Sequence, residues 1–191
     1  MNALWLAPLL AGTLWTTGCG DMMSLEPLAT KDNTVFDAAL LGTWTDNEGT
    51  LCVVRQLDKV DNKAYDIAWV NSGSTGDKIR LQGHLVQMGA ERVLDALAVD
   101  PGTFSVPAHV FLRVRLSPGA MELRFLDSEW LQNQVKQSSL AHTVSGNHPV
   151  ITAPAAQVGT FLQQSGLKEE ALDKPLLLTR LVPEAKPTPA K

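Results

Sequence analysis

The feature that most constrains the fold is a succession of short segments in which apolar and polar residues alternate. In the segment 79–88, Ile79, Leu81 and Leu85 alternate with polar neighbours. Side chains of a β-strand point to opposite faces in turn, so this pattern indicates a strand with one buried face. Turn-forming residues separate eight such segments, at 40–46, 50–57, 64–70, 79–88, 92–99, 106–117, 121–127 and 175–181.

The connections between the first seven segments are short and polar. Short connections favour antiparallel pairing between consecutive strands. A meander of this length is expected to close on itself, because closure removes the unpaired edge strands. The sequence therefore predicts a mainly β fold, a small antiparallel up-and-down barrel or half-barrel of about eight strands with two late helices. A flat sheet with both helices across one face is the alternative.

The two helices are predicted between the seventh and eighth strands. The first covers 127–137, with Asp127 or Ser128 as N-cap. The second covers 152–166, with Thr152 as cap, a proline in the first turn and Gly166 at the end. Segments around these helices, including His142 and His148, are expected to be loops.

Charge and composition exclude one class of partner. The 191 residues include 16 Lys and Arg against 20 Asp and Glu, a formal net charge of -4. Because no basic surplus is available to neutralise phosphates, we expect no nucleic-acid partner. The composition is otherwise that of a globular domain. We place this domain at 33–182, followed by a disordered tail at 183–191 that is rich in Pro and Ala.

The first residues form a targeting signal. Residues 1–18 carry no charged side chain, and their apolar part is too short to span a bilayer. Small residues directly before Cys19 resemble the lipobox of bacterial lipoproteins. The resemblance implies a signal peptide at 1–18, acylation of Cys19 and a lipidated tether at 19–32. An unprocessed or a soluble secreted protein is the alternative.

The same resemblance implies a place in the cell. Gly20 follows the cysteine, which in lipoproteins of Gram-negative bacteria goes with sorting to the outer membrane. We therefore expect a protein of the cell envelope, anchored on the periplasmic face of the outer membrane. Asp21 lies one residue further on, and it leaves the inner membrane open as the alternative.

A second resemblance lies at the first strand. Gly42, Thr43 and Trp44 in "LLGTWT" resemble the G-x-W motif of lipocalins. The resemblance implies a lipocalin-like barrel, with an arginine from the last strand stacked on the tryptophan face. Arg180 is available for this structural role. More distantly, the order of segments resembles bacterial lipoproteins whose function is not established.

The candidate ligand-binding residues lie on one face of the segment 106–117. His109, Arg113 and Arg115 share this face. If it points into a closed barrel, these groups can hold an anionic ligand such as a fatty-acid carboxylate. If the apolar face with Val110 and Leu112 points inward instead, the same groups form a solvated outer face. The register of the strand decides between the two, since a shift of one residue exchanges the faces.

Motifs for catalysis and metal binding are missing from the sequence. The chain contains neither G-x-S-x-G nor S-x-x-K, and Cys52 lies in an alternating apolar run. His142 and His148 lack the spacing of a zinc site. The segment 73–78 in "GSTGDK" is interpreted as a hairpin turn rather than a phosphate loop. We expect a non-enzymatic protein without metal or cofactor.

Two functions from different classes remain. The first is a lipid-anchored envelope protein that binds an apolar or amphipathic small molecule inside its barrel. The second is a structural or accessory lipoprotein that acts through protein contacts with a solidly packed barrel. The interior discriminates between them: small residues such as Gly83, Ala96 and Ala98 can leave a cavity, whereas large inward side chains fill it.

Overall fold

A computed structural model describes residues 22–57, 62–71, 78–99, 107–138, 140–145 and 148–181. The predicted signal peptide at 1–18, the proposed lipidation at Cys19 and the predicted tail at 183–191 lie outside the described residues. The segment interpreted as a hairpin turn, 73–78, is described only at Lys78.

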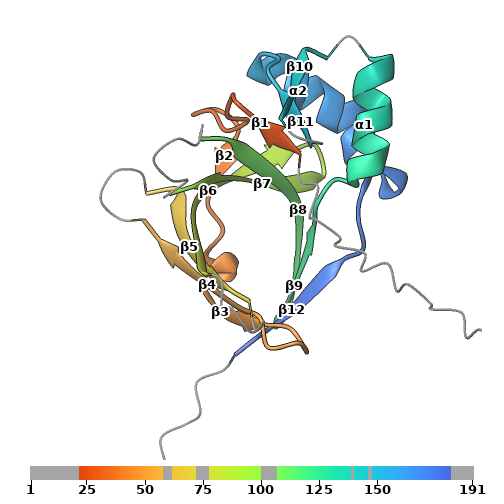
Figure 1. Cartoon of the computed structure of the whole chain (residues 1–191). Coiled ribbons are helices and arrows are strands. Elements are labelled where there is room, and N and C mark those ends of the chain that lie inside the picture. Colours follow the sequence, from red (N-terminus) through yellow and green to blue (C-terminus); the bar gives the residue numbers. More distant parts are fainter. Residues whose placement is uncertain are drawn as a thin grey trace, which may run out of the picture.

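Eight antiparallel strands close into a barrel (Figure 1). Each consecutive pair from β3 to β8 is hydrogen-bonded, β12 lies between β3 and β9, and pairing of β8 with β9 completes the ring. The strands are β3 (Gly42–Thr45), β4 (Leu51–Gln56), β5 (Ala64–Val70), β6 (Lys78–Met88), β7 (Glu91–Ala98), β8 (His109–Ser117), β9 (Ala120–Arg124) and β12 (Leu176–Arg180). The predicted barrel of eight strands is confirmed, and the flat sheet is wrong.

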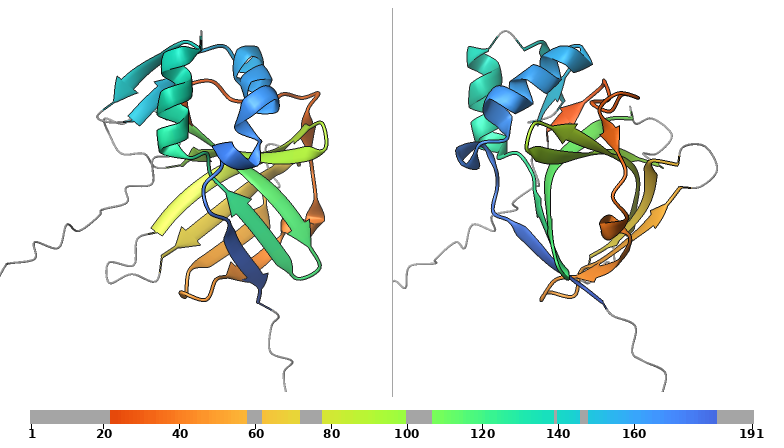
Figure 2. Two further views of the ribbon diagram at one scale, coloured as in Figure 1. Left: turned by 90° about the vertical axis from the view of Figure 1, so that its right-hand side faces the viewer. Right: turned by 180° about the vertical axis from the view of Figure 1, so that it is seen from behind.

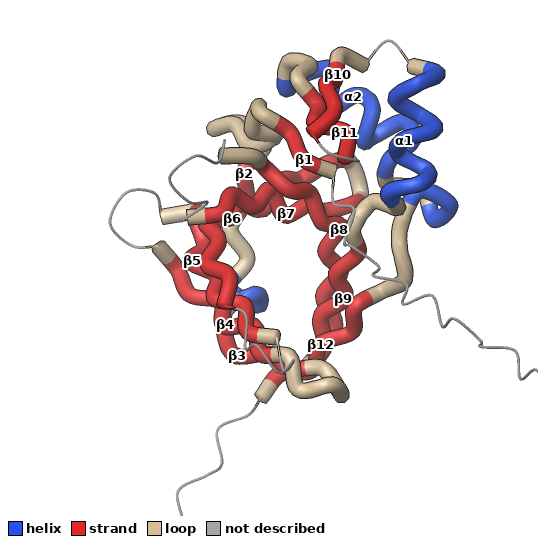
Figure 3. The backbone as a smooth tube through the Cα atoms, viewed as in Figure 1, coloured by secondary structure: helices blue, strands red, loops and turns tan. Residues whose placement is uncertain are grey.

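The alternating pattern divides each strand between the interior and the outer surface. In one cross-strand row, Trp44 pairs with Cys52, which pairs with Trp69 on the other side. Figure 3 shows the strands as a closed ring, and the core inside it receives buried side chains from all eight of them. It consists of Leu40, Trp44, Cys52, Val54, Tyr65, Ile67, Leu85, Leu94, Ala96, Leu112, Val114, Met121, Leu123 and Leu178.

The helices lie between β9 and β12, as predicted. Helix α1 (Ser128–Gln137) is capped by Asp127, whose carboxylate accepts a hydrogen bond from the Trp130 amide at 2.6 Å. Helix α2 (Ala155–Phe161) continues into a π-helical turn, η2 (Leu162–Gly166), and a 3-10 turn, η3 (Glu169–Ala171), follows.

The predicted start of the second helix at Thr152 is wrong. Pro154 occupies the N-cap, with no side-chain hydrogen bond. The residue before a proline is disfavoured in helical conformation, so Ala153 cannot belong to the helix. The amides of Thr152 and Ala153 instead donate to the carbonyl of Ala141 at 2.9 and 3.0 Å.

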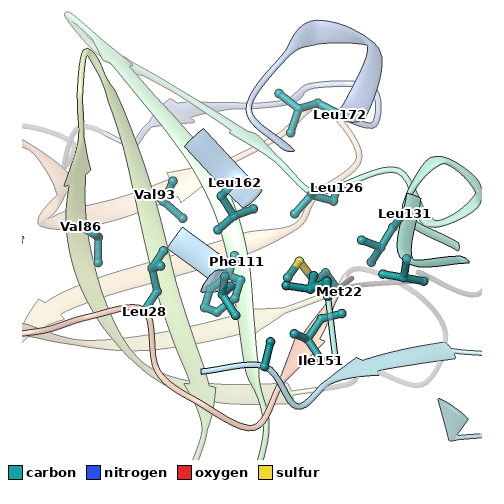
Figure 4. Packing of buried hydrophobic residues seen from close by; sticks show 14 residues of the cluster. Met22, Leu28, Val86, Val93, Phe111, Leu126, Leu131, Ile151, Leu162 and Leu172 are labelled. Atoms are coloured by element: carbon teal, nitrogen blue, oxygen red, sulfur yellow. The ribbon is translucent and has the colours of Figure 1, made fainter. Parts of the chain in front are cut away.

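A second hydrophobic core lies outside the barrel, under the helices (Figures 2 and 4). The outer faces of β6, β7 and β8 contribute Val86, Val93 and Phe111 to it. Trp130 of α1 packs against Phe161 of α2, with ring centroids 5.9 Å apart. The remaining buried members are Met22, Leu28, Leu126, Leu131, Val135, Leu140, Ile151, Ala153, Val158, Leu162 and Leu172. The fold is therefore a barrel with a helical layer packed against one side.

The N-terminal segment is part of the domain, so the prediction of a tether fails for residues 22–32. Met22 is 1% exposed and Leu28 is also buried. Strand β1 (Met23–Ser24) is inserted between β8 and β11, and β2 (Thr34–Val35) pairs with the end of β6. The amides of Leu28 and Ala29 donate to the buried carboxylate of Asp95, at 2.8 and 2.9 Å.

The segment with His142 and His148, expected to be a loop, forms a hairpin. Strand β10 (His142–Ser145) pairs antiparallel with β11 (His148–Ile151), and β11 pairs in parallel with β1. The pairing of β1 with β11 joins segments more than 120 residues apart, so no local pattern in the sequence indicates it. The hairpin and β1 extend the sheet beyond β8, beside the helices (Figure 1).

Candidate functional site

One end of the barrel is closed around Trp44. The guanidinium of Arg180 lies over the Trp44 ring, with its carbon 4.4 Å from the ring centroid. Its Nη1 and Nη2 donate to the carbonyls of Leu41 and Ala39, at 2.7 and 2.5 Å. The indole Nε1 donates to the carbonyl of Leu40 at 2.9 Å. The last strand is thereby bonded to the short 3-10 turn η1 (Ala38–Leu40) that precedes the first barrel strand.

Gly42 is required by this arrangement. Its φ is +140°, a backbone conformation that L side chains rarely adopt. A Cβ at this position would lie 2.8 Å from Nη1 of Arg180. The stacking expected from the G-x-W resemblance is therefore present at Gly42, Trp44 and Arg180, where it serves to close the barrel.

Tyr65 and Arg92 complete the closure, and sequence reasoning did not single them out. The Tyr65 hydroxyl accepts a hydrogen bond from the amide of Asp37 at 2.7 Å, and its ring stacks on Phe36 at 5.3 Å. Arg92 forms an ion pair with the carboxylate of Asp37. Burial raises the pKa of Tyr65, so its hydroxyl stays protonated. The alternation in the segment 64–70 puts Tyr65 and Ile67 on the same face of the strand, but it does not indicate a partner for the hydroxyl.

The middle of the barrel is filled by its own side chains. Trp44, Tyr65, Leu85 and Leu178 are all fully buried. At Gly83, where the sequence leaves space, a Cβ would lie 2.9 Å from Cδ1 of Leu94 and 3.1 Å from Cδ1 of Ile67. Neighbouring side chains therefore already occupy the space that the small residue leaves.

At the opposite end, the inward-facing row is less covered. Trp69 is only partly buried, and Ile79, its cross-strand partner, is 45% exposed. Part of the inward apolar surface is thus accessible at this end.

The predicted anion-binding face points out of the barrel. Val110, Leu112, Val114 and Leu116 pack in the interior core, so His109, Arg113 and Arg115 lie on the outer surface. Because this face does not point into the barrel, the three residues cannot hold an anionic ligand there, and the prediction of such a site is wrong. The physical reason is that burial of the apolar face stabilises the fold, whereas burial of three basic groups would have to be compensated.

The three basic residues are bound to carboxylates instead. His109 Nδ1 lies 2.6 Å from Asp95, and Arg115 Nη2 donates to Glu91 at 2.7 Å. Arg113 is 2% exposed, which contradicts the alternative of a solvated face at this position. Its Nη1 and Nη2 donate to Glu169 and Glu122, at 2.7 and 3.1 Å.

Glu169 connects this network to the helical layer. It lies on η3 and accepts hydrogen bonds from Arg113 and Arg124. These two guanidinium groups lower the pKa of Glu169 to about 2. Arg124 also donates to the carbonyls of Leu172 and Asp173, at 2.9 and 2.6 Å. The network fastens the segment that returns from the helices to β12.

Two further candidate sites in the described residues, a surface depression and the thiol of Cys52, do not support ligand binding or a reaction. A surface depression of about 100 Å³ lies on the outer face of β4 and β5, lined by Val53, Arg55, Asp66 and Ala68. Ligand pockets are commonly about 300–1,000 Å³, so this depression is too small for a lipid. Burial raises the pKa of Cys52 to about 12, which keeps its thiol protonated and unreactive.

The described parts of the chain contain neither a group of metal ligands nor a membrane-spanning helix. Among those residues, no three His, Cys, Asp or Glu side chains are grouped as metal ligands. Within the same residues, no helix has the length and hydrophobicity to cross a bilayer.

Comparison of the chain with protein-family models, with curated proteins and with solved structures finds no match.

Proposed function

We propose that this is a lipid-anchored protein of the cell envelope whose packed barrel serves as a scaffold for protein contacts. The anchor is Cys19, and the periplasmic face of the outer membrane is the proposed location. The proposal takes the anchor from the lipobox-like residues before Cys19 and the scaffold role from the packing of the barrel.

The packing around Gly83 carries the scaffold part of the proposal. A carrier barrel keeps space for its ligand, and the smallest inward residues are where that space would lie. Leu94 and Ile67 reach into that position, so even one added methyl group would be crowded. This supports a filled interior over a ligand cavity.

An uncharged surface on the barrel suits a protein partner. The outward positions of β12, β3, β4 and β5, apart from the charged pair Arg55 and Asp66 at the margin, form what we call the outer patch: Thr43, Thr45, Leu51, Val53, Ala68, Val70, Leu177, Thr179 and Leu181. Among the described residues, six large hydrophobic side chains are exposed, and the patch holds three of them. Exposed apolar groups gathered on one face are typical of interaction surfaces.

A small-molecule carrier is the second candidate. The observation that favours it is the accessible apolar row at Trp69 and Ile79. A ligand would enter at this end and displace side chains from the interior.

Native mass spectrometry separates the two functions. The full chain would be expressed with its leader and purified from host envelopes without added lipid. We expect the mass of the processed, acylated chain with no further adduct. A reproducible extra mass would favour the carrier.

Titration with a fluorescent fatty acid provides a second readout. We expect no saturable binding by the wild-type protein. If binding is saturable, Ile79→Glu should abolish it when the ligand enters at this end, whereas Leu177→Glu on the outer patch is the matched control.

A further inference from the structure

The helical layer and its hairpin contain no acidic residue between Glu129, in the first turn of α1, and Glu169 on η3. From Trp130 to Lys168 the sequence contains no Asp or Glu, although the chain as a whole holds 20 in 191 residues. At that average, a stretch of this length would contain about four. The stretch comprises most of α1, the β10–β11 hairpin, α2 and η2, and we call it the cap. The negative charge of the protein is therefore carried outside the cap.

The cap is also where the proposed anchor joins the domain. Cys19 precedes Met22 by three residues, and Met22 is buried in the core under the helices. Strand β1, which follows directly, is hydrogen-bonded to β11 of the cap. Three residues span at most about 11 Å, even when fully extended.

This distance is short compared with the dimensions of a bilayer. The headgroup region on one side of a membrane is roughly 5–8 Å thick. A domain held within about 11 Å of its acylated residue cannot rotate freely above the membrane. A domain on a tether of a dozen residues could do so. Some face of the domain next to β1 must therefore lie against the headgroups whenever Cys19 is acylated.

The surface of the cap suits such a contact. Val144 on β10 is 64% exposed, and Leu25, directly after β1, is also exposed. Lys136 and His142 are exposed on the same layer. Bacterial membranes expose anionic lipids, which attract lysine and repel carboxylates. The cap residues contribute no carboxylate and so do not add to that repulsion, whereas the exposed Glu26, next to Leu25, and Glu129, in the first turn of α1, lie just outside the cap.

We infer that the cap is the membrane-facing surface of the protein and that its partner is an anionic bilayer. The inference rests on the proposed acylation of Cys19. It places the outer patch, on the far side of the barrel, toward the aqueous compartment (Figures 1 and 2). One face would thus contact lipid while the opposite face remains open to a protein partner.

Two labelling positions test the orientation. Val144 and Leu177 are both apolar and almost equally exposed, at 64% and 63%, but they belong to β10 and β12, which lie on opposite sides of the molecule (Figure 1). A nitroxide would be attached to Val144→Cys and, as the matched control, to Leu177→Cys. Acylation consumes the Cys19 thiol, and Cys52 is buried, so each variant offers one reactive site.

The processed, acylated chain would be reconstituted in vesicles of phosphatidylethanolamine and phosphatidylglycerol. Collision of each label with a water-soluble nickel chelate and with oxygen then reports its distance from the bilayer. We expect several-fold less collision with the chelate at position 144 than at position 177, with higher access to oxygen. In vesicles of phosphatidylcholine alone the contrast should decrease.

Equal access of the chelate to both positions would overturn the inference, and an equal contrast in neutral vesicles would overturn its electrostatic part. The intact mass of the same sample distinguishes this failure from that of the anchor. A chain without the diacylglycerol mass contradicts the proposed function, whereas an acylated chain with equally accessible labels contradicts only the orientation. If either cysteine variant fails to fold, hydrogen exchange of β10 and β12 in the wild-type protein gives the same comparison.

Discussion

The guanidinium carbon of Arg180 lies 4.4 Å from the centroid of the Trp44 ring and joins the last strand of the barrel to the first. The cation is held in place by carbonyls of the turn before β3, so stacking and hydrogen bonding act on one side chain. Trp44 is 1% exposed beneath it. This contact therefore joins two strands that lie near opposite ends of the described chain.

Replacement of Arg180 by Ala should lower the free energy of unfolding by about 2–3 kcal/mol. The loss combines a cation–π contact with hydrogen bonds from a charged donor to two carbonyls. Urea unfolding measures it, and near-UV circular dichroism reports the changed surroundings of Trp44. The exposed Arg55→Ala is the control and should change stability by less than about 0.5 kcal/mol.

Gly83→Ala should destabilise the protein by about 1–3 kcal/mol, because the added methyl group would overpack the interior against Leu94 and Ile67. Gly159→Ala is the matched control. Its Cβ would meet only Cδ1 of Leu28, at 3.6 Å, and alanine favours the helix by about 1 kcal/mol over glycine. Thermal unfolding of both variants gives the comparison. A neutral Gly83→Ala would mean that the interior has unused space.

Asp95→Ala should release the N-terminal segment from the barrel. The substitution leaves the amides of Leu28 and Ala29 without their acceptor, at a cost of about 2–4 kcal/mol. Hydrogen exchange at these two amides should accelerate before the strands of the barrel exchange. Asp66→Ala removes a carboxylate from the exposed pair with Arg80 and should cost less than about 1 kcal/mol.

The stability that Glu169 contributes should depend on pH in acid. The two guanidinium groups lower its pKa to about 2 in the folded protein, from the usual 4.5 of a glutamate. A depressed carboxyl pKa stabilises the fold fully above the unfolded value and loses that effect as pH falls toward the folded value. The difference in unfolding free energy between the wild type and Glu169→Gln should therefore be constant near neutral pH and shrink between about pH 4.5 and 2. Urea unfolding across this range measures it, and a difference that does not change with pH would contradict the prediction.

The number of thiols that iodoacetamide alkylates should show whether Cys19 is acylated. Burial raises the pKa of Cys52 to about 12, so iodoacetamide at neutral pH should leave this thiol of the folded protein unmodified. In urea, the acylated protein should gain one carbamidomethyl group at Cys52. A chain with an unmodified Cys19 should gain two, which makes the count a separate test of the anchor.

The sequence by itself determined the number and order of the barrel strands, because each alternating segment and its turn residues are local features. The start of α1 at Asp127 or Ser128 was predictable for the same reason, and the structure has Asp127 as the cap. The resemblance of Gly42 and Trp44 to the G-x-W motif implied that Arg180 stacks on Trp44, and the structure shows this stacking.

Only the tertiary structure decided which face of β8 points inward. His109, Arg113 and Arg115 alternate with four apolar residues, and either face satisfies the local pattern. The closed barrel determines that the apolar face of β8 points inward, because all eight strands must bury their apolar rows together. Local sequence patterns likewise did not predict that residues 22–32 dock against the barrel or that β10 and β11 form a hairpin. These segments acquire their structure from β8, Asp95 and each other, partners distant in the sequence, and short segments of this kind have no stable conformation without such partners.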